Sequence, residues 1–411
     1  MQHEQDNSQA QIPSILFVDD ESRILDALRR MLRSQKNKWD IKFTTSGREA
    51  LELMARQPFK VVISDMKMPE MDGGELLDRI RQLYPETIRF ILSGHADKEM
   101  ILRTIGPTHR FFTKPCDSGF LIKEISKAIA TCNTMNAHKD IQAVVSGTLF
   151  LPAMPELYAE LKSELEKPDM SIKRIAEIIS HDVAMTAEIL HLVNSSFFGP
   201  YQDENNVFEA LKYLGAETVK GIILSTGVLQ TLPEATLKQF DLRELQKHSI
   251  HTGDLCGMIV KDVMPGNTQM IDRAITAGLL HDIGKLILVT NVSESYTAIY
   301  QKYKQGALPL HAVEENTLST THAEVGGYLA ALWGSPQSIS DAISCHHQPS
   351  TSLNESFSIL TAVHIANILT HECSNRSNEK YPLEFDSQYL KKTKTGNRLE
   401  GWREIARNII T

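Results

Sequence analysis

The sequence of 411 residues has few cysteines, no long hydrophobic run and no dense basic cluster, and each shortage excludes a class of protein. Its five cysteines are scattered without Cys-x-x-Cys spacing, which is typical of reduced thiols and not of a disulfide framework or a zinc ribbon. No apolar stretch approaches the roughly 20 residues that a transmembrane helix needs. The polar first eleven residues have no signal-peptide core. These features predict a cytoplasmic protein with no membrane partner.

Positive charge is also scarce, since the formal net charge is −8 and the densest basic stretch is Lys391-Lys392-Thr393-Lys394. The segments Val207–Gly215 and Thr218–Leu229 have the pattern of a helix-turn-helix. Between Glu217 and Gln230, however, Lys220 is the only basic residue. Because phosphate contacts dominate the affinity of DNA-binding modules, direct DNA binding is not expected.

The length of the chain and a change in hydrophobic periodicity indicate more than one domain. Residues 12–131 alternate short apolar strands with helices of about ten residues, which is typical of a doubly wound parallel sheet. Pro152 and Pro155 interrupt any helix that would continue from this region. After Pro155 the periodicity is wholly helical. The sequence therefore predicts an α/β domain followed by an all-α domain.

Polar side chains follow four predicted strands of the first domain. They are Asp19-Asp20 after Ile15–Val18, Asp65 after Val61–Ile63, Ser93 after Phe90–Leu92, and Lys114 after Phe111–Thr113. One such aspartate alone is more often a loop cap. Here, however, several such residues occur, and the carboxyl ends of parallel strands lie at one edge of the sheet. Carboxylates clustered at that edge favour the binding of Mg²⁺. With a lysine that neutralises phosphoryl oxygens, these groups predict a phosphoryl-transfer pocket.

In this order on alternating strands and helices, these residues resemble the receiver domain of two-component response regulators over residues 12–131. The resemblance implies a flavodoxin-like, five-stranded parallel sheet and a sensor histidine kinase or phosphotransfer protein as partner. It implies the following roles: Asp65 as phosphoacceptor, Asp19, Asp20 and Asp65 as Mg²⁺ ligands, Ser93 and Lys114 as catalytic groups, and Phe111 as the switch aromatic. Since Phe111 has no hydroxyl, its coupling to Ser93 would act through packing alone.

Four further stretches resemble, in order, the HDOD output domain, which is a relative of HD phosphohydrolases. They are Leu151–Pro155, Ile178–Thr186, Leu192–Gly199 and Ala210–Gly215. The resemblance implies a signalling module that contacts a downstream protein, and it leaves room for a homodimer. The predicted organisation is a disordered lead (1–11), the receiver (12–131), a helical linker (132–149), the HDOD domain (150–372, its HD-like part 241–372) and a C-terminal loop and helix (373–411).

The pair His281-Asp282 stands inside the apolar stretch Ala274–Leu286, which is predicted to form one helix. Buried charges are costly unless they are paired or bound to a metal, so a structural pair and a metal site both remain open. More imidazoles occur on helices predicted nearby: His248 in Leu245–Val260, His322 before Ala323–Leu332, and His346-His347 after Ile339–Cys345. Such a set suits divalent Fe, Mn or Zn.

In sequence order, these residues resemble the metal ligands of HD-type phosphohydrolases, among them the HD-GYP phosphodiesterases that hydrolyse cyclic di-GMP. Two departures argue against catalysis. Asn367 replaces the final aspartate, and Gln348-Pro349-Ser350 replaces a glutamate-arginine and Gly-Tyr-Pro signature. Two functions therefore remain: a response regulator with a non-catalytic HDOD domain that holds at most one divalent ion, and a receiver-gated phosphodiesterase or phosphohydrolase.

Overall fold

A computed structural model describes most of the chain. The described residues are 12–94, 106–134, 139–148, 151–167, 169–194, 206–215, 219–220, 223, 230–306, 308–374 and 383–410. The helix expected near Lys98–Thr104, most of the one expected over Thr218–Leu229, and the end of the Leu192–Gly199 stretch lie outside these residues. The chain divides into two compact units, Met1–Thr134 and Met135–Thr411.

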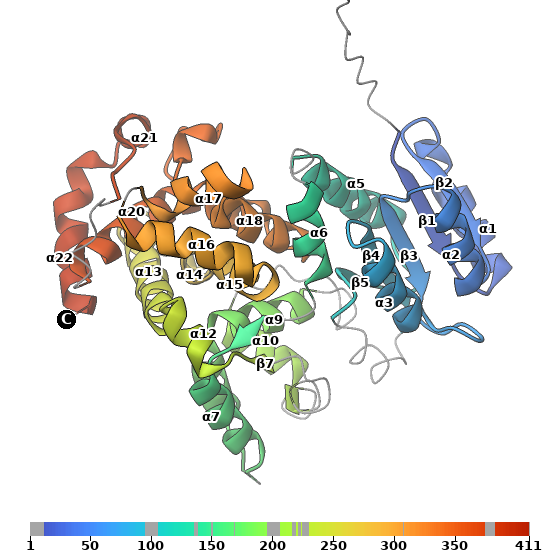
Figure 1. Ribbon diagram of the computed structural model, residues 1–411, viewed down its shortest axis with the longest axis horizontal. Helices are drawn as coiled ribbons and strands as arrows, with labels where there is room; N and C mark the ends of the chain where they lie inside the picture. Colours follow the sequence, from blue (N-terminus) through green and yellow to red (C-terminus); the bar gives the residue numbers. More distant parts are fainter. Residues whose placement is uncertain are drawn as a thin grey trace, which may run out of the picture. The chain divides into compact units, whose positions relative to one another are not determined.

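The first unit is built on a five-stranded parallel sheet with strand order β2-β1-β3-β4-β5 (Figure 1). Its strands are β1 (Ser14–Val18), β2 (Asp40–Thr44), β3 (Val61–Asp65), β4 (Ile88–Ser93) and β5 (Arg110–Thr113), and its described helices are α1 (Ser22–Met31), α2 (Gly47–Arg56), α3 (Gly73–Leu83) and α5 (Ser118–Thr134). Every residue of β3 and β4 is buried, which explains their near-continuous apolar runs. The predicted flavodoxin-like fold is confirmed.

The turn after β3 needs a glycine because the chain there runs close to its own backbone. A Cβ atom on Gly73, the first residue of α3, would lie 2.1 Å from the carbonyl oxygen of Asp65. Asp72 caps the same helix, its side chain accepting a hydrogen bond from the Glu75 amide at 2.8 Å. The end of β3 is thereby held against the start of α3.

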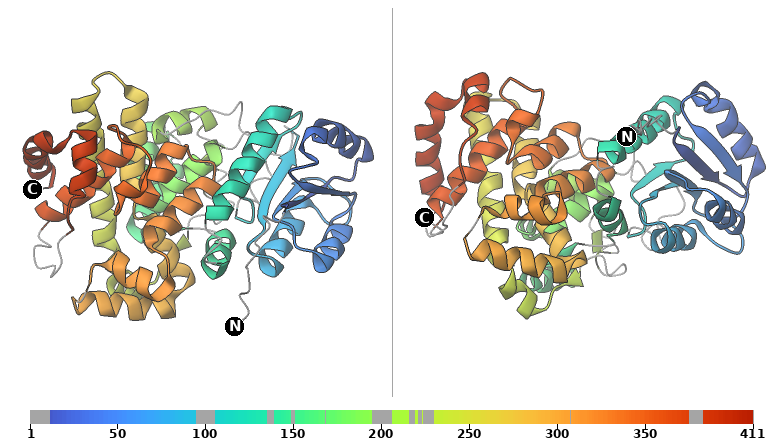
Figure 2. Two further views of the ribbon diagram at one scale, coloured as in Figure 1. Left: turned by 90° about the horizontal axis from the view of Figure 1, so that it is seen from above. Right: turned by 45° about the horizontal axis from the view of Figure 1, so that its top comes forward.

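In its described residues, the second unit is helical apart from a two-stranded parallel ladder of β6 (Pro152–Ala153) and β7 (Gln230–Thr231). Its helices are α6 (Lys139–Gly147), α7 (Pro155–Leu165), α8 (Ile172–Ser180), α9 (Val183–Val193), α10 (Val207–Leu214), α12 (Glu234–Gln239), α13 (Leu242–Val263), α14 (Thr268–Leu280), α15 (Ile283–Asn291), α16 (Ser293–Lys304), α17 (Leu310–Leu318), α18 (His322–Leu332), α19 (Gln337–Cys345), α20 (Ile359–Cys373), α21 (Ser387–Thr393) and α22 (Leu399–Ile410). Figure 2 shows α13 and α14 as an antiparallel pair, in yellow. The predicted all-α domain is confirmed.

The two prolines act differently from the simple interruption expected. Pro152 belongs to strand β6, and Pro155 is the first residue of helix α7, a position where its missing N–H costs nothing. Helix α6, expected in a linker, packs within the second unit, where Gln142 Nε2 donates to Tyr328 Oη at 3.1 Å. The helix predicted over Leu399–Ile410 is confirmed as α22. Among the described helices, none has both the length and the hydropathy of a membrane span.

Two buried carboxylates hold the strand segment that enters the second unit. Asp182 accepts hydrogen bonds from the amides of Met154 (2.7 Å) and Met185 (2.8 Å), and Glu188 accepts one from the amide of Leu151 (3.2 Å). Burial raises the pKa of Asp182 to about 6 and the pKa of Glu188 to about 8. At neutral pH Glu188 is therefore mainly protonated.

The substitution Glu188→Gln is expected to flatten the dependence of stability on pH. The folded chain keeps the Glu188 proton up to about pH 8, whereas the unfolded chain releases it near its ordinary pKa of about 4.3. The free energy of unfolding therefore falls as pH rises through this window, by up to about 1.4 kcal/mol per pH unit. Glutamine keeps the accepting oxygen but does not ionise. In the variant, the free energy of unfolding should therefore fall less steeply with pH, by up to the same amount of about 1.4 kcal/mol per pH unit.

Urea denaturation at several pH values measures this slope. Two of the three tryptophans, Trp333 and Trp402, are buried in the second unit and report its unfolding by fluorescence. Glu166→Gln is the matched control, because Glu166 is exposed and directly follows the last residue of α7. Equal slopes in the two variants would contradict the prediction.

Candidate functional site

The first candidate site lies at the carboxyl edge of the receiver-like sheet. The Lys114 ammonium, just after β5, donates to Asp19 Oδ2 at 2.6 Å and to Asp65 Oδ1. The other oxygens of the two carboxylates accept backbone hydrogen bonds, from the Lys67 amide to Asp65 (2.7 Å) and from the Glu21 amide to Asp19 (3.0 Å). Three of the predicted residues, from three strand ends, thus meet in one pocket.

The balance of charge in this pocket favours a cation. Burial raises the pKa of Asp19, although its hydrogen bond to Lys114 opposes that effect. For Lys114, burial lowers the pKa, but the hydrogen bonds and charges of Asp19 and Asp65 outweigh it, so the net shift is upward and the ammonium stays charged. One lysine does not neutralise Asp19, Asp65 and the adjacent, exposed Asp20. This oxygen-rich donor set fits Mg²⁺.

The remaining receiver residues occupy the positions that the sequence predicted. Ser93 ends β4, is fully buried and pairs in register with Thr113, and its carbonyl accepts a hydrogen bond from the Lys114 amide at 2.8 Å. Phe111 on β5 is 1% exposed and pairs with Ile91. Motion of Phe111 would therefore require repacking between β5 and its neighbours.

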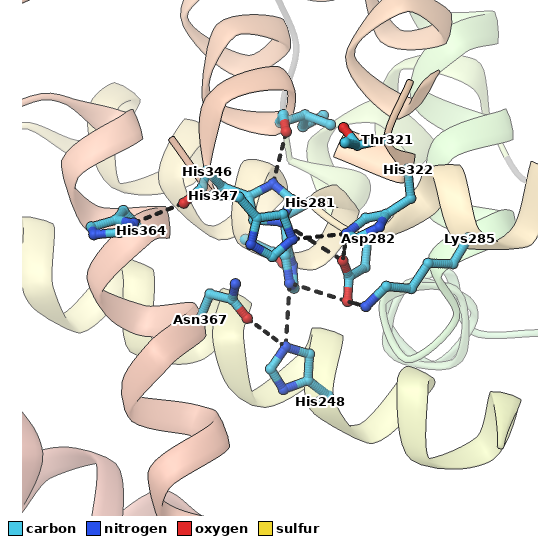
Figure 3. A network of polar contacts seen from close by, with 12 residues as sticks. His248, His281, Asp282, Lys285, Thr321, His322, His346, His347, His364 and Asn367 are labelled. Carbon is cyan, nitrogen blue, oxygen red and sulfur yellow. Dashed lines mark hydrogen bonds and ion pairs between the residues drawn. The ribbon is translucent and has the colours of Figure 1, made fainter. Parts of the chain in front are cut away.

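The second candidate site is a cluster of imidazoles at the centre of the helical unit (Figure 3). It contains His248 from α13, His281 and Asp282 between α14 and α15, His322 at the start of α18, His346 and His347 after α19, and Asn367 from α20. All seven predicted residues are brought together, and only His347 is partly exposed. These seven residues, which are spread over positions 248–367, thus form one buried polar centre.

The expected single helix over Ala274–Leu286 is wrong. Helix α14 ends at Leu280 and α15 begins at Ile283, so His281 and Asp282 form the turn between them. The chain changes direction here because α14 packs on α13 and α15 packs on α18. A Cβ atom on Gly284 would lie 1.9 Å from the carbonyl oxygen of His322, which shows how closely α15 approaches the start of α18.

Asp282 connects the two halves of the cluster. Its Oδ2 accepts a hydrogen bond from Lys285 Nζ at 2.6 Å and lies 3.4 Å from His281 Nε2. Its Oδ1 lies 3.1 Å from His322 Nε2 and 3.9 Å from His346 Nε2. Although burial raises the pKa of Asp282, the neighbouring His281, Lys285 and His322 hold it well below its usual range. Asp282 is therefore ionised.

Three histidines are oriented by hydrogen bonds from their Nδ1 atoms. His281 contacts the Gly278 carbonyl (2.6 Å), His346 the Ile343 carbonyl (2.8 Å), and His322 the carboxylate of Glu314 (2.6 Å). Because Nδ1 is the donor in His281 and His346, their Nε2 atoms are left with lone pairs on the side of Asp282. For His322, burial lowers the pKa, but Glu314 and Asp282 outweigh that effect and raise it, so a metal ion would have to displace a proton from His322 Nε2. His346 Nε2 is buried and has no hydrogen-bond partner among the residues described.

One half of the cluster has the geometry of a metal site. The ligand atoms of His322, His346 and His347 lie within 4.8 Å of one another, and Asp282 Oδ1 faces two of them. Burial lowers the pKa of His346 and His347 well below the ordinary value, so both imidazoles are neutral, as metal ligands must be. Three imidazoles and one carboxylate suit a divalent transition metal.

The other half, His248, His281 and Asp282, also has its ligand atoms within 4.8 Å of one another, but hydrogen bonds and an ion pair occupy them. Asn367 Oδ1 lies 2.9 Å from His248 Nε2, and an amide oxygen can only accept, so this nitrogen of His248 carries the proton. His281 Nε2 lies 3.3 Å from the same nitrogen, and Lys285 already neutralises Asp282 Oδ2. With the neutral amide of Asn367 here, this half has no free anionic ligand among the described residues.

Sequence reasoning missed three groups that support the cluster, Glu314, Tyr296 and Lys285. Glu314 on α17 is fully buried and holds His322, while Tyr296 Oη donates to the other oxygen of Glu314 at 2.6 Å. Nothing in the spacing along the chain points to Glu314. Lys285 had a signal, because it stands three residues after Asp282 in one helical turn.

A cavity of about 60 Å³ adjoins this cluster. Aromatic residues of α16 line one side, and cluster residues line the other. The residues concerned include Tyr296, Tyr300, Tyr303, Lys285, His322 and His347.

Comparison with known proteins finds two domain families. Residues 15–126 match the response regulator receiver domain, and residues 151–349 match the HDOD domain. An uncharacterized protein of Treponema pallidum is 25% identical over 218 residues, which are 53% of this chain and 42% of that protein. The hydrogenase transcriptional regulatory protein HoxA of Cupriavidus necator is 34% identical over 118 residues, 28% of this chain and 24% of HoxA. The chain thus spans less than half the length of these relatives.

Two solved structures are similar to parts of this chain. The MmoQ response regulator of Methylococcus capsulatus is 23% identical, with 59% of this chain and 97% of that chain covered and a TM-score of 0.47. The signal receiver domain of an HD domain-containing protein from Pseudomonas fluorescens is 33% identical. The similarity covers 30% of this chain and 92% of that chain, with a TM-score of 0.29.

Proposed function

The chain is a response regulator with an N-terminal receiver domain and a C-terminal HDOD domain, and we propose that phosphorylation of Asp65 controls it. The observation that carries this proposal is the contact of Lys114 with both Asp19 and Asp65 at the strand ends. From there the ammonium is within reach of oxygen atoms added to Asp65. A sensor histidine kinase or a phosphotransfer protein would supply the phosphoryl group.

The residues of the pocket divide the work of phosphoryl transfer. The Asp65 carboxylate is the nucleophile, and Lys114 offsets the charge of the incoming group. Mg²⁺, held by Asp19, Asp20 and Asp65, would neutralise phosphoryl oxygens when bound. Ser93 then donates its hydroxyl to the new group, and the packing of Phe111 responds.

The HDOD domain is proposed to pass the signal on by contact with a downstream protein, or through a homodimer, without hydrolysing a substrate. In support, the hydrogen bond between Asn367 and His248 closes one half of the histidine cluster. A single Fe, Mn or Zn ion would be held by His322, His346, His347 and Asp282. Such an ion would cross-link α18, the end of α19 and the α14–α15 turn.

A second candidate function is a receiver-gated phosphodiesterase or phosphohydrolase acting on cyclic di-GMP or another nucleotide. The cavity of about 60 Å³ beside His322 and His347 is lined by tyrosines, on which a planar base could stack only if the cavity opened further. The closed half of the cluster argues against this function, because a two-metal mechanism uses both ions to clamp attacking and leaving oxygens.

Phosphorylation is expected to shift a conformational equilibrium of the receiver. Binding of a phosphoryl mimic with Mg²⁺ should change amide hydrogen exchange severalfold around Ser93 and Phe111, in α5, and over residues 140–155, since all three regions link the pocket with the second unit along the chain. Exchange followed by mass spectrometry measures this, and light scattering shows whether self-association changes as well.

Asp65→Asn, treated with the same mimic, is the control and should show no change. Identical exchange of residues 140–155 with and without the mimic in the unmodified chain would exclude this route of transmission.

A further inference from the structure

Two consecutive hydrogen bonds connect the C-terminal segment with the histidine cluster. The amide N–H of Asp386 donates to His364 Nε2 at 3.0 Å. His364 Nδ1 contacts the carbonyl oxygen of His346 at 2.8 Å (Figure 3). A neutral imidazole carries only one N–H. Because Nε2 accepts from Asp386, the proton lies on Nδ1 and is donated to His346. Both bonds thus depend on the same tautomer.

Asp386 also holds the chain on the other side of His347. Its Oδ2 accepts a hydrogen bond from the Ser350 amide at 3.3 Å, and its Oδ1 caps α21 by accepting one from the Tyr389 amide at 2.9 Å. Residues 346–350 follow the end of α19 and are not part of an α-helix. The segment that carries His346 and His347 is therefore fixed from both ends by one residue.

The C-terminal segment is itself firmly anchored. Tyr389 on α21 is 1% exposed, and its hydroxyl lies 3.0 Å from Thr361 Oγ1 on α20. Trp402 on α22 is equally buried and donates to Asp262 Oδ2 on α13 at 3.0 Å. The match to the HDOD domain ends at residue 349, so this anchor comes from outside the matched region.

We propose that His364 and Asp386 are positioning residues for His346 and His347, and that the segment 383–410 is thereby a part of the metal site. The proposal rests on the metal site described above. His364 is 1% exposed and uses both ring nitrogens in hydrogen bonds, so it supports the ligands without binding the ion. Loss of such a supporting partner typically weakens metal binding by about 10- to 100-fold.

Titration of the full chain with Mn²⁺ by calorimetry tests the role of His364. His364→Leu removes both hydrogen bonds and should raise the Kd about 10- to 100-fold. His364→Asn keeps a donor close to the Nδ1 position and should recover much of that loss. Tyr389→Phe removes a buried hydroxyl contact of the same segment but leaves His364 alone, so it should lower stability and not metal affinity.

The Asp386 amide is tested by a pair of substitutions. Asp386→Ala loses the side-chain bonds and keeps the N–H, whereas Asp386→Pro also removes the N–H. The backbone φ of −68° suits proline, so the difference in Kd between the two variants isolates the bond to His364. A Kd several times higher for the proline variant is expected.

Hydrogen exchange of residues 343–350 in the metal-free chain gives a readout that needs no ion. It should be faster in His364→Leu and Asp386→Pro than in the unmodified chain or in Tyr389→Phe. If the unmodified chain binds no Mn²⁺, the proposed metal site fails, and exchange alone decides on the positioning role. Unchanged exchange in His364→Leu overturns the inference. A Kd of His364→Leu equal to the Kd of Tyr389→Phe overturns it as well.

Discussion

Asp65→Asn is expected to abolish labelling of the chain by a small-molecule phosphoryl donor in the presence of Mg²⁺. An amide is a poor nucleophile. Asp19 also contacts Lys114, but it follows the end of β1, whereas Asp65 is itself the last residue of β3, the central strand of the sheet. Lys114→Ala should slow labelling about 100-fold or more, the usual effect of removing one group that stabilises developing charge. Mass spectrometry of the intact protein measures both.

Asp78→Asn provides the matched control, because Asp78 lies on the exposed side of α3 and pairs with Arg81 away from the pocket. It should be labelled at the rate of the unmodified chain. Labelling of Asp65→Asn at that rate would show that another residue is the phosphoacceptor.

The helical unit is expected to retain at most one divalent ion per chain and to hydrolyse cyclic di-GMP very slowly or not at all. His346→Ala should reduce metal content by at least tenfold, because it removes a buried Nε2 that has no hydrogen-bond partner among the described residues. His248→Ala should reduce it far less, because its Nε2 already donates to Asn367. Elemental analysis after dialysis against Mn²⁺, Fe²⁺ or Zn²⁺ measures occupancy, and chromatography of the nucleotide measures turnover.

Asn367→Asp tests the reason for this limit. The new carboxylate would accept the same hydrogen bond from His248 and add the negative charge that a second ion needs. Metal occupancy should rise, but turnover should stay low, because the Gly-Tyr-Pro signature is still missing. Two tightly bound ions and rapid hydrolysis in the unmodified chain would overturn this prediction and support the enzyme function.

The receiver pocket was predictable from sequence because its geometry follows from a simple rule. Each of its residues ends a strand, and the carboxyl ends of parallel strands lie at one edge of the sheet. Finding the apolar runs before Asp19, Asp65, Ser93 and Lys114 was therefore enough to bring the side chains together. The contacts of Lys114 with Asp19 and Asp65 agree with that expectation.

The helical unit was less predictable because hydrophobic periodicity does not show where a buried chain turns. Residues 274–286 have apolar side chains on both sides of the His281-Asp282 pair, and the break between α14 and α15 follows from packing on two different helices. Pro152 and Pro155 lie at the start of the residues matched to the HDOD domain, whereas the chain divides into compact units after Thr134. The strand pairing of Pro152 depends on Gln230 in β7, 78 positions later.

The amino-acid sequence alone was sufficient to determine the five strands of the first unit, most of the helices and the seven candidate ligands, because periodicity and residue chemistry are properties of short stretches. Only the folded chain decided which half of the histidine cluster is open. The reason is that the hydrogen-bond partner of one imidazole nitrogen decides whether the other nitrogen carries a proton or has a lone pair for a metal ion. Those partners come from distant helices: Glu314 from α17 for His322, and Asn367, 119 positions away, for His248.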